Sequence, residues 1–269
     1  MLELRFNPFL VFKESKSPAG LYARKRWLGE ADTLLWKKDF NDTKNSLMDE
    51  QAADGSWNTS TLESIKRLFG LHLTVRNPTE EIQRALDWLI NNALHHVSPD
   101  NLWSGSVVHS HELIDLPFTS GQTHLLESCA TLFLATIFGR GYEPLIMSHY
   151  RIIVGLITDY EEYLFHNWSD TNNILRALVV HPQFSESEAT TMLVEYLGKI
   201  QNQQGFWPNQ VPFYQTFNAF AHLPPALSGE QLTKAGMVLY NSQNEDGTWG
   251  REDREWNTFL TVHALKNIG

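Results

Sequence analysis

The chain has 269 residues, of which 42% are hydrophobic, enough to bury one large core or two small ones. Its net charge of −10 argues against nucleic acid or an anionic membrane as the main partner. A single cysteine, Cys129, excludes a disulfide framework and a zinc site built from several cysteines. No secretory signal or membrane-spanning run is predicted, so we expect a soluble, cytoplasmic protein.

Helical periodicity continues along most of the chain after an irregular arm over residues 1–17. Segments that are apolar over most of their surface alternate with segments that carry one apolar stripe, as expected for inner and outer helices. A long polar connection over residues 95–122 interrupts this alternation. The predicted inner helices are 17–29, 61–76, 125–138, 170–180, 213–222 and 255–268, and the predicted outer helices are 31–51, 80–94, 143–165, 187–201 and 229–243.

A pattern Gln-x-x-x-Gly-x-Trp occurs three times, beginning at Gln51, Gln201 and Gln243. Copies with the same internal spacing indicate a repeat architecture. The glycine suits a turn after a helix, and the tryptophan supplies a large apolar plate with one N–H donor. The glutamine can bond backbone groups left over at a neighbouring helix end. We therefore predict that each copy joins adjacent helical hairpins.

This pattern resembles the QW repeat of squalene and other terpene cyclases, a superfamily that includes the β subunits of protein prenyltransferases. The resemblance implies an all-α fold with one domain, 1–269, built as a single α/α toroid. About six inner helices would surround an apolar cavity, with five to six outer helices around them. Prenyltransferases hold zinc with Asp, Cys and His on late inner helices, and residues 212–215 and 256–257 do not supply these ligands. No metal site is therefore expected.

The run from Asn167 to Leu178 is similar to a segment of class II terpene cyclases that reads Asp-x-Asp-Asp-Thr and leads into Leu-Arg-Ala-Leu. In that family the middle Asp protonates the substrate, but this chain has Ser169 at that position and keeps only the last acid, Asp170. The resemblance implies Asp170 as the proton donor, and the same residue also suits a helix N-cap. Glu127, a carboxylate within an otherwise apolar helix, is the second candidate acid.

Aromatic, histidine and amide side chains on the expected inner helices are the candidate substrate contacts. Aromatic ring faces stabilise cations, which suits a carbocation reaction. A histidine on an apolar helix is either a substrate contact or a satisfied core residue. The predicted substrate-binding residues are Trp168, Asn173, Phe133, Tyr214, Phe217, Trp256, His72 and His263.

These features favour a terpene-cyclase-like enzyme that cyclises an apolar isoprenoid by protonation in a central cavity. No cofactor is expected, although a diphosphate substrate would add a requirement for Mg²⁺. Two other interpretations stay open. One is a non-catalytic binding or assembly protein, which Ser169 favours because it replaces the proton-donating acid. The other is an (α/α)6 carbohydrate-active enzyme, which needs two acidic groups across a polar cleft.

Overall fold

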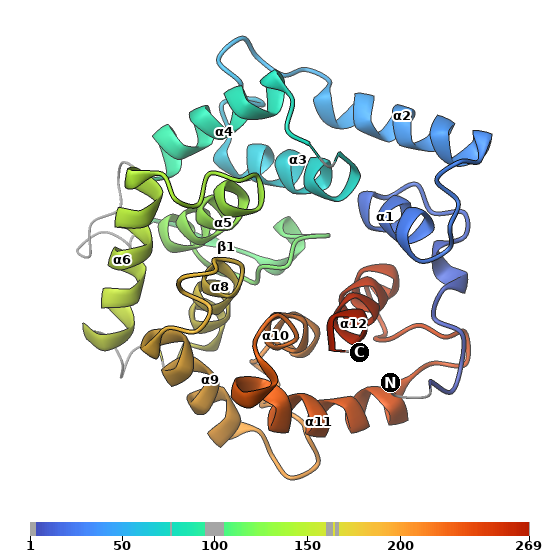
Figure 1. Ribbon diagram of the computed structural model, residues 1–269, viewed down its shortest axis with the longest axis vertical. Helices are drawn as coiled ribbons and strands as arrows, with labels where there is room; N and C mark the ends of the chain where they lie inside the picture. Colours follow the sequence, from blue (N-terminus) through green and yellow to red (C-terminus); the bar gives the residue numbers. More distant parts are fainter. Residues whose placement is uncertain (1–3, 76, 95–104, 160–163, 165–166, 269) are drawn as a thin grey trace.

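The computed structural model describes residues 4–75, 77–94, 105–159, 164 and 167–268. The all-α class is confirmed, and the helices alternate along the chain between an inner ring and an outer layer (Figure 1). The inner helices are α1 (Pro18–Arg26), α3 (Thr61–Thr74), α5 (Thr123–Ile137), α8 (Trp168–Val179), α10 (Phe213–Phe220) and α12 (Arg254–Ile268). The outer helices are α2 (Leu34–Met48), α4 (Glu80–Ala93), α6 (Pro144–Asp159), α9 (Glu188–Ile200) and α11 (Pro225–Ser242).

The inner helices form a ring that closes on itself. Each packs against the next in the order α1, α3, α5, α8, α10 and α12, and α12 returns to α1. Ser15 and Ser17, just before α1, donate hydrogen bonds to Glu255 on α12 and so fasten the joint between the two ends of the chain. This arrangement agrees with the predicted α/α toroid.

The three Gln-x-x-x-Gly-x-Trp segments connect an outer helix to the next inner helix, as predicted, and their tryptophans are buried. Trp57, Trp207 and Trp249 are at most 5% exposed. Each indole Nε1–H donates to a carbonyl at the end of the preceding outer helix, those of Asp49, Leu197 and Leu239, at 2.8–3.0 Å.

Each glutamine of these segments bonds both its own turn and a neighbouring segment. Gln201 Nε2 donates to the Gly205 carbonyl at 3.0 Å and to the Gln231 carbonyl on α11 at 3.1 Å. Gln51 and Gln243 repeat the pattern toward α4 and the N-terminal arm. Glycine is required at this position for two reasons. Its φ is +90° at Gly205, and a Cβ there would lie 2.2 Å from the Lys234 carbonyl oxygen.

Helix ends differ from the predictions where local capping decides them. Helix α11 begins at Pro225 rather than near 229, because proline suits the first turn of a helix. The expected irregular arm contains a short 3-10 helix, η1 (Leu10–Phe12), and Ser17 caps α1. The expected end of the outer helix at residue 165 lies outside the described residues.

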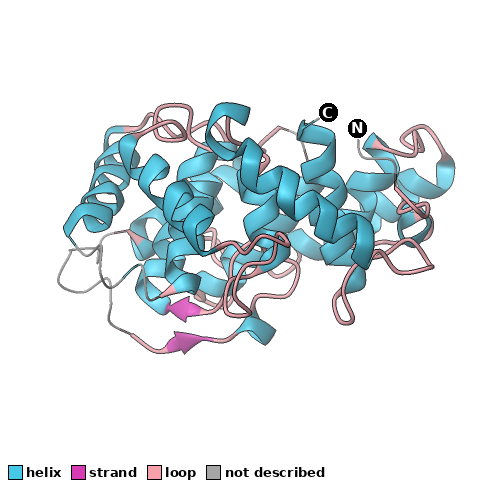
Figure 2. Cartoon of the chain, turned by 90° about the horizontal axis from the view of Figure 1, so that it is seen from below, coloured by secondary structure: helices cyan, strands magenta, loops and turns pink. Residues whose placement is uncertain are grey.

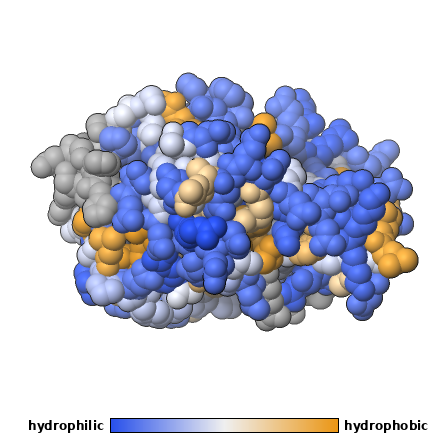
Figure 3. Space-filling view, turned by 90° about the horizontal axis from the view of Figure 1, so that it is seen from above, coloured by the Kyte–Doolittle hydropathy of each residue, from blue (hydrophilic) through white to orange (hydrophobic). Residues whose placement is uncertain are grey.

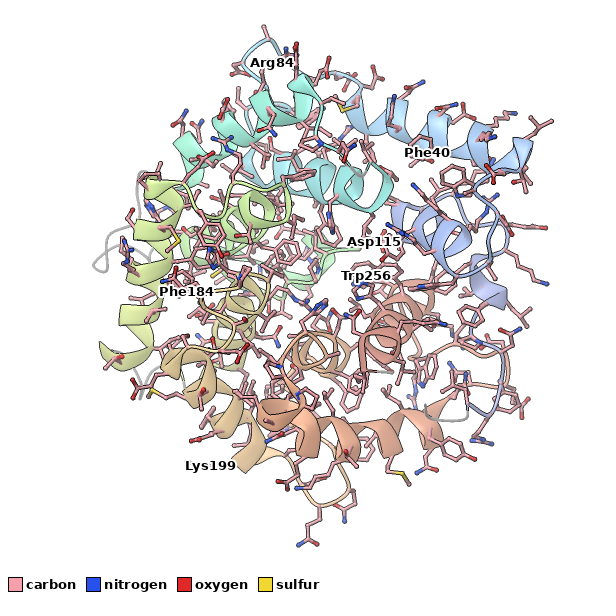
Figure 4. The ribbon with its side chains drawn as sticks, viewed as in Figure 1. Phe40, Arg84, Asp115, Phe184, Lys199 and Trp256 are labelled. Carbon is pink, nitrogen blue, oxygen red and sulfur yellow. The ribbon has the colours of Figure 1, made fainter. Side chains whose placement is uncertain are left out.

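Residues 105–122, the described part of the connection between α4 and α5, contain secondary structure and buried apolar side chains that the sequence did not predict. They include a short antiparallel strand pair, β1 (Val107–Val108) and β2 (Gly121–Gln122), and a 3-10 helix, η2 (Ser110–Glu112). The strands lie at one end of the helical ring (Figure 2). Leu113, Leu116 and Phe118 join the buried core. We call residues 113–119 the plug segment, since Asp115 within it lies near the middle of the ring (Figure 4).

The surface of the molecule is mainly hydrophilic when it is seen from the side of the ring, with small and separate hydrophobic patches (Figure 3). Among the described helices, none combines the length and the apolar character needed to cross a membrane.

Candidate functional site

A cavity of about 490 Å³ lies within the ring. Every inner helix contributes to its lining, and Pro117 of the plug segment adds one wall. The lining residues come mainly from the C-terminal halves of α1, α3, α5, α8 and α10, because the plug segment fills the opposite end. The volume is within the range of roughly 300–1,000 Å³ typical of small-molecule pockets.

One side of the cavity is an aromatic wall. Trp256, Phe259 and His263 follow one another at helical spacing on α12, so their rings share one face of that helix. The Trp256 and Phe259 rings are stacked at 5.3 Å, and Phe69 lies 6.0 Å from both Trp256 and Phe133. Figure 4 shows Trp256 near the centre of the ring. These four phenyl and indole rings are at most 5% exposed and form the apolar side of the cavity.

Among the described residues, the charged side chains that line the cavity are all basic: Lys25, Arg26 and Arg176. Arg176 is 2% exposed, and its Nη2 donates to the Gln215 carbonyl at 3.1 Å and to Asn218 Oδ1 at 2.9 Å. Both acceptors are neutral, and the buried Nε has no hydrogen-bond partner. Burial lowers the pKa of the Arg176 guanidinium to about 9.

Arg24, the other deeply buried arginine among the described residues, has carboxylate partners. Arg24 pairs with Asp39 at 2.9 Å and with Glu30 at 2.7 Å. Arg176 sits in the last turn of α8, where the helix dipole stabilises a cation by about 0.3–1 kcal/mol. Removing an ion from water costs several kcal/mol, so neutral acceptors and the dipole compensate Arg176 only in part.

Three histidines line the same cavity and are uncharged at neutral pH. Burial lowers the pKa of His72 to about 4. Burial and the nearby Arg176 charge lower the pKa of His263 to about 4 and that of His222 to about 3. The fixed positive charge of the cavity therefore comes from its arginines and lysine.

The expectation that Asp170 faces the cavity is wrong. Asp170 is fully buried in the first turn of α8 and is not part of the lining. Its carboxylate lies against Gly121, where an added Cβ would come within 2.8 Å of Asp170 Oδ1. The N-cap interpretation is also wrong, because Asn167 caps the helix through a bond from the Asp170 N–H at 3.3 Å. The physical reason is position along the helix: the cavity is at the far end of α8.

Glu127 is likewise outside the cavity lining. It lies in the N-terminal half of α5 and accepts a hydrogen bond from the Thr61 hydroxyl at the start of α3. Burial raises the pKa of Glu127, while the bond from Thr61 opposes that rise. The carboxylate thus joins two inner helices at the end that is remote from the cavity.

The predicted substrate contacts divide into two groups. Phe133, Trp256, His72 and His263 line the cavity as expected, whereas Phe217, Tyr214, Trp168 and Asn173 do not.

Each member of the second group has another environment. Phe217 is fully buried in the core, and Tyr214 packs against Phe213. Trp168 stacks on Tyr196 of α9 at 5.7 Å. Asn173 holds the plug segment, since it exchanges two bonds of 2.9 and 3.0 Å with the Thr119 backbone.

The cavity is also lined by residues that were not predicted as substrate contacts, among them Arg176, Asn218, His222, Tyr22 and Phe259. The sequence carried a usable signal for three of them. Arg176 is the one charge in the apolar run from Ile174 to Val180, and Asn218 and His222 are at i and i+4 in the predicted helix 213–222.

A smaller pocket of about 270 Å³ lies on the other side of the plug segment and shares Trp256 with the cavity. It is lined by Asp115, Asp253 and several amide side chains. Burial raises the pKa of Asp115, and the charges of Glu255 and Asp253 raise it further. Within the described residues, no group of three potential ligand side chains is placed to hold a metal ion.

No protein-family model matches the sequence, and no curated protein is significantly similar to it. Among solved structures, a crystal structure of a protein from Actinoplanes matches with a TM-score of 0.56. The match covers 96% of this chain and 90% of that one, at 14% sequence identity. The similarity therefore concerns the fold alone.

Proposed function

We propose that the protein is a terpene-cyclase-like toroid whose central cavity binds an apolar isoprenoid chain. The observation that carries this proposal is the aromatic wall of Phe69, Phe133, Trp256 and Phe259 inside the ring of inner helices. An isoprenoid chain would gain roughly 25 cal/mol per Å² of apolar surface buried against these rings. Aromatic rings that line the cavity also suit a positive charge that develops on the chain.

Binding has stronger support than protonation-initiated cyclisation. A class II reaction needs a carboxylic acid facing the substrate, and no carboxylate is among the side chains that line the cavity within the described part of the chain. The neutral histidines are proton acceptors rather than acids at neutral pH. A binding protein that kept the toroid and lost the acid is therefore the nearest alternative to a cyclase.

A carbohydrate-active enzyme is the second alternative, and one observation favours it. The smaller pocket is lined by Asp115 and Asp253 together with amide side chains and Trp256, a combination that suits a hydroxylated ligand. It is about half the volume of the central cavity, at about 270 against about 490 Å³, and so holds a smaller ligand.

The test is to titrate the purified protein with farnesyl diphosphate, geranylgeranyl diphosphate and squalene, and then to extract products from incubations with and without Mg²⁺. We expect at least one of these ligands to bind, and Phe259→Ala to weaken that binding about tenfold. The matched control is Phe206→Ala, because Phe206 is 49% exposed and outside the cavity. Failure of all three ligands to bind the folded protein would refute the proposal.

A further inference from the structure

Arg176 is a buried positive charge for which the described residues supply no carboxylate. Desolvation by burial is the influence that acts on its pKa, with no opposing contribution from a nearby acid. Its Nε is buried without a hydrogen-bond partner. Arg24 is equally buried and also has one unpaired nitrogen, Nη2, but unlike Arg176 it has two carboxylate partners. The free charge at Arg176 is therefore a local feature of the cavity and not a general property of buried arginines in this fold.

Asn218 determines what surrounds this charge. Its Oδ1 accepts from Arg176 at 2.9 Å, and its Nδ2 donates to the Leu260 carbonyl at 2.8 Å. The same Nδ2 lies 3.4 Å from Nδ1 of His263. Because Nδ2 is a donor, the His263 Nδ1 acts as the acceptor, and the proton of the neutral ring is on Nε2. An aspartate at position 218 would instead place a carboxylate beside the guanidinium.

We infer that the part of the cavity around Arg176 is an anion site. In this site Arg176 binds a phosphate or carboxylate head group, and the neutral Asn218 leaves the guanidinium charge without a carboxylate partner. Helices α8, α10 and α12 bring Arg176, Asn218 and His263 together, and the aromatic wall continues from His263 to Trp256. A ligand with an anionic head and an apolar body satisfies both parts of the cavity. Only the identity of the apolar part of the ligand, an isoprenoid chain, rests on the proposed function.

The experiment compares three ligands that share one chain: farnesyl phosphate, farnesoic acid and farnesol. Calorimetry on the wild-type protein should show at least one anion binding about tenfold more tightly than the alcohol, since hydrogen bonds to a charged partner are the stronger class. The two anionic arms separate phosphate from carboxylate. In Arg176→Gln the farnesyl anions should bind at most about threefold more tightly than farnesol, while the affinity for farnesol stays at the wild-type value.

Two further variants control for charge and for folding. Arg140→Gln makes the same substitution in an arginine that pairs with Glu143 and Asp87 and lies outside the cavity, and it should keep the wild-type preference. Asn218→Asp should abolish the preference, because the new carboxylate pairs with Arg176 and repels the ligand head. An equal affinity for anions and alcohol in the wild type, or an undiminished preference in Arg176→Gln, would overturn the inference.

A readout without an isoprenoid separates this inference from the proposed function. Inorganic phosphate should raise the melting temperature of the wild type above that in chloride at equal ionic strength, and it should not do so in Arg176→Gln. If phosphate stabilises in this way but no farnesyl ligand binds, the anion site stands and the isoprenoid proposal fails. If farnesol binds and neither phosphate nor the farnesyl anions show an advantage, the anion site is wrong.

Discussion

Truncation of Trp207 tests the role of the repeated Gln-x-x-x-Gly-x-Trp segments in the stability of the fold. The indole is 5% exposed, its ring lies 5.5 Å from Phe213 and 5.7 Å from Phe220, and its N–H donates to the Leu197 carbonyl at 2.9 Å. Trp207→Ala removes the ring and should lower the free energy of unfolding by about 3–5 kcal/mol. Trp207→Phe keeps most of the apolar contact but leaves the Leu197 carbonyl without its donor. This should lower the free energy of unfolding by about 1–2 kcal/mol.

Urea unfolding followed by circular dichroism measures both changes. For a slope of about 3 kcal/mol per M, the midpoint of Trp207→Ala should fall by roughly 1–2 M. Phe206→Ala is the matched control, since the neighbouring ring is 49% exposed and its loss should change stability by less than about 1 kcal/mol. A wild-type midpoint for Trp207→Ala, or an equal loss in Phe206→Ala, would show that the tryptophan does not fasten the hairpins.

Three other outcomes follow from the structure. Asp170→Asn should leave isoprenoid affinity and any turnover unchanged, and loss of turnover in a stable variant would restore Asp170 as the acid. Gly205→Ala should destabilise the fold by at least about 1–3 kcal/mol, measured by urea midpoint, because φ is +90° and the new Cβ would lie 2.2 Å from the Lys234 carbonyl. The unfolded chain binds more protons than the folded one as pH falls from about 6.5 to about 4, because the pKa values of His72 and His263 are lowered to about 4. Stability should therefore fall over this window by about 1.4 kcal/mol per pKa unit per histidine, and His72→Gln should flatten the slope.

The helices and their joints were predictable because local chemistry specifies them. Apolar periodicity identified the inner and outer helices, and the repeated segment identified three of the joints between them. The glycine of each joint needs a positive φ, and the tryptophan bonds a carbonyl only 8 or 10 residues earlier in the chain. Interactions of such short range leave a signature in a single sequence.

The position of the cavity depended on tertiary structure. Asp170 and Arg176 are six residues apart on α8, yet Arg176 lines the cavity and Asp170 lies against Gly121 at the other end of the helix. The plug segment determines which of these two side chains faces the cavity. Asn173 holds the plug segment through hydrogen bonds to Thr119, which is 54 residues away in the chain. A motif that spans both ends of one helix cannot reveal which end is filled by a distant connection. The sequence therefore determined the ring, and the packing of the plug segment within it determined which residues face the ligand.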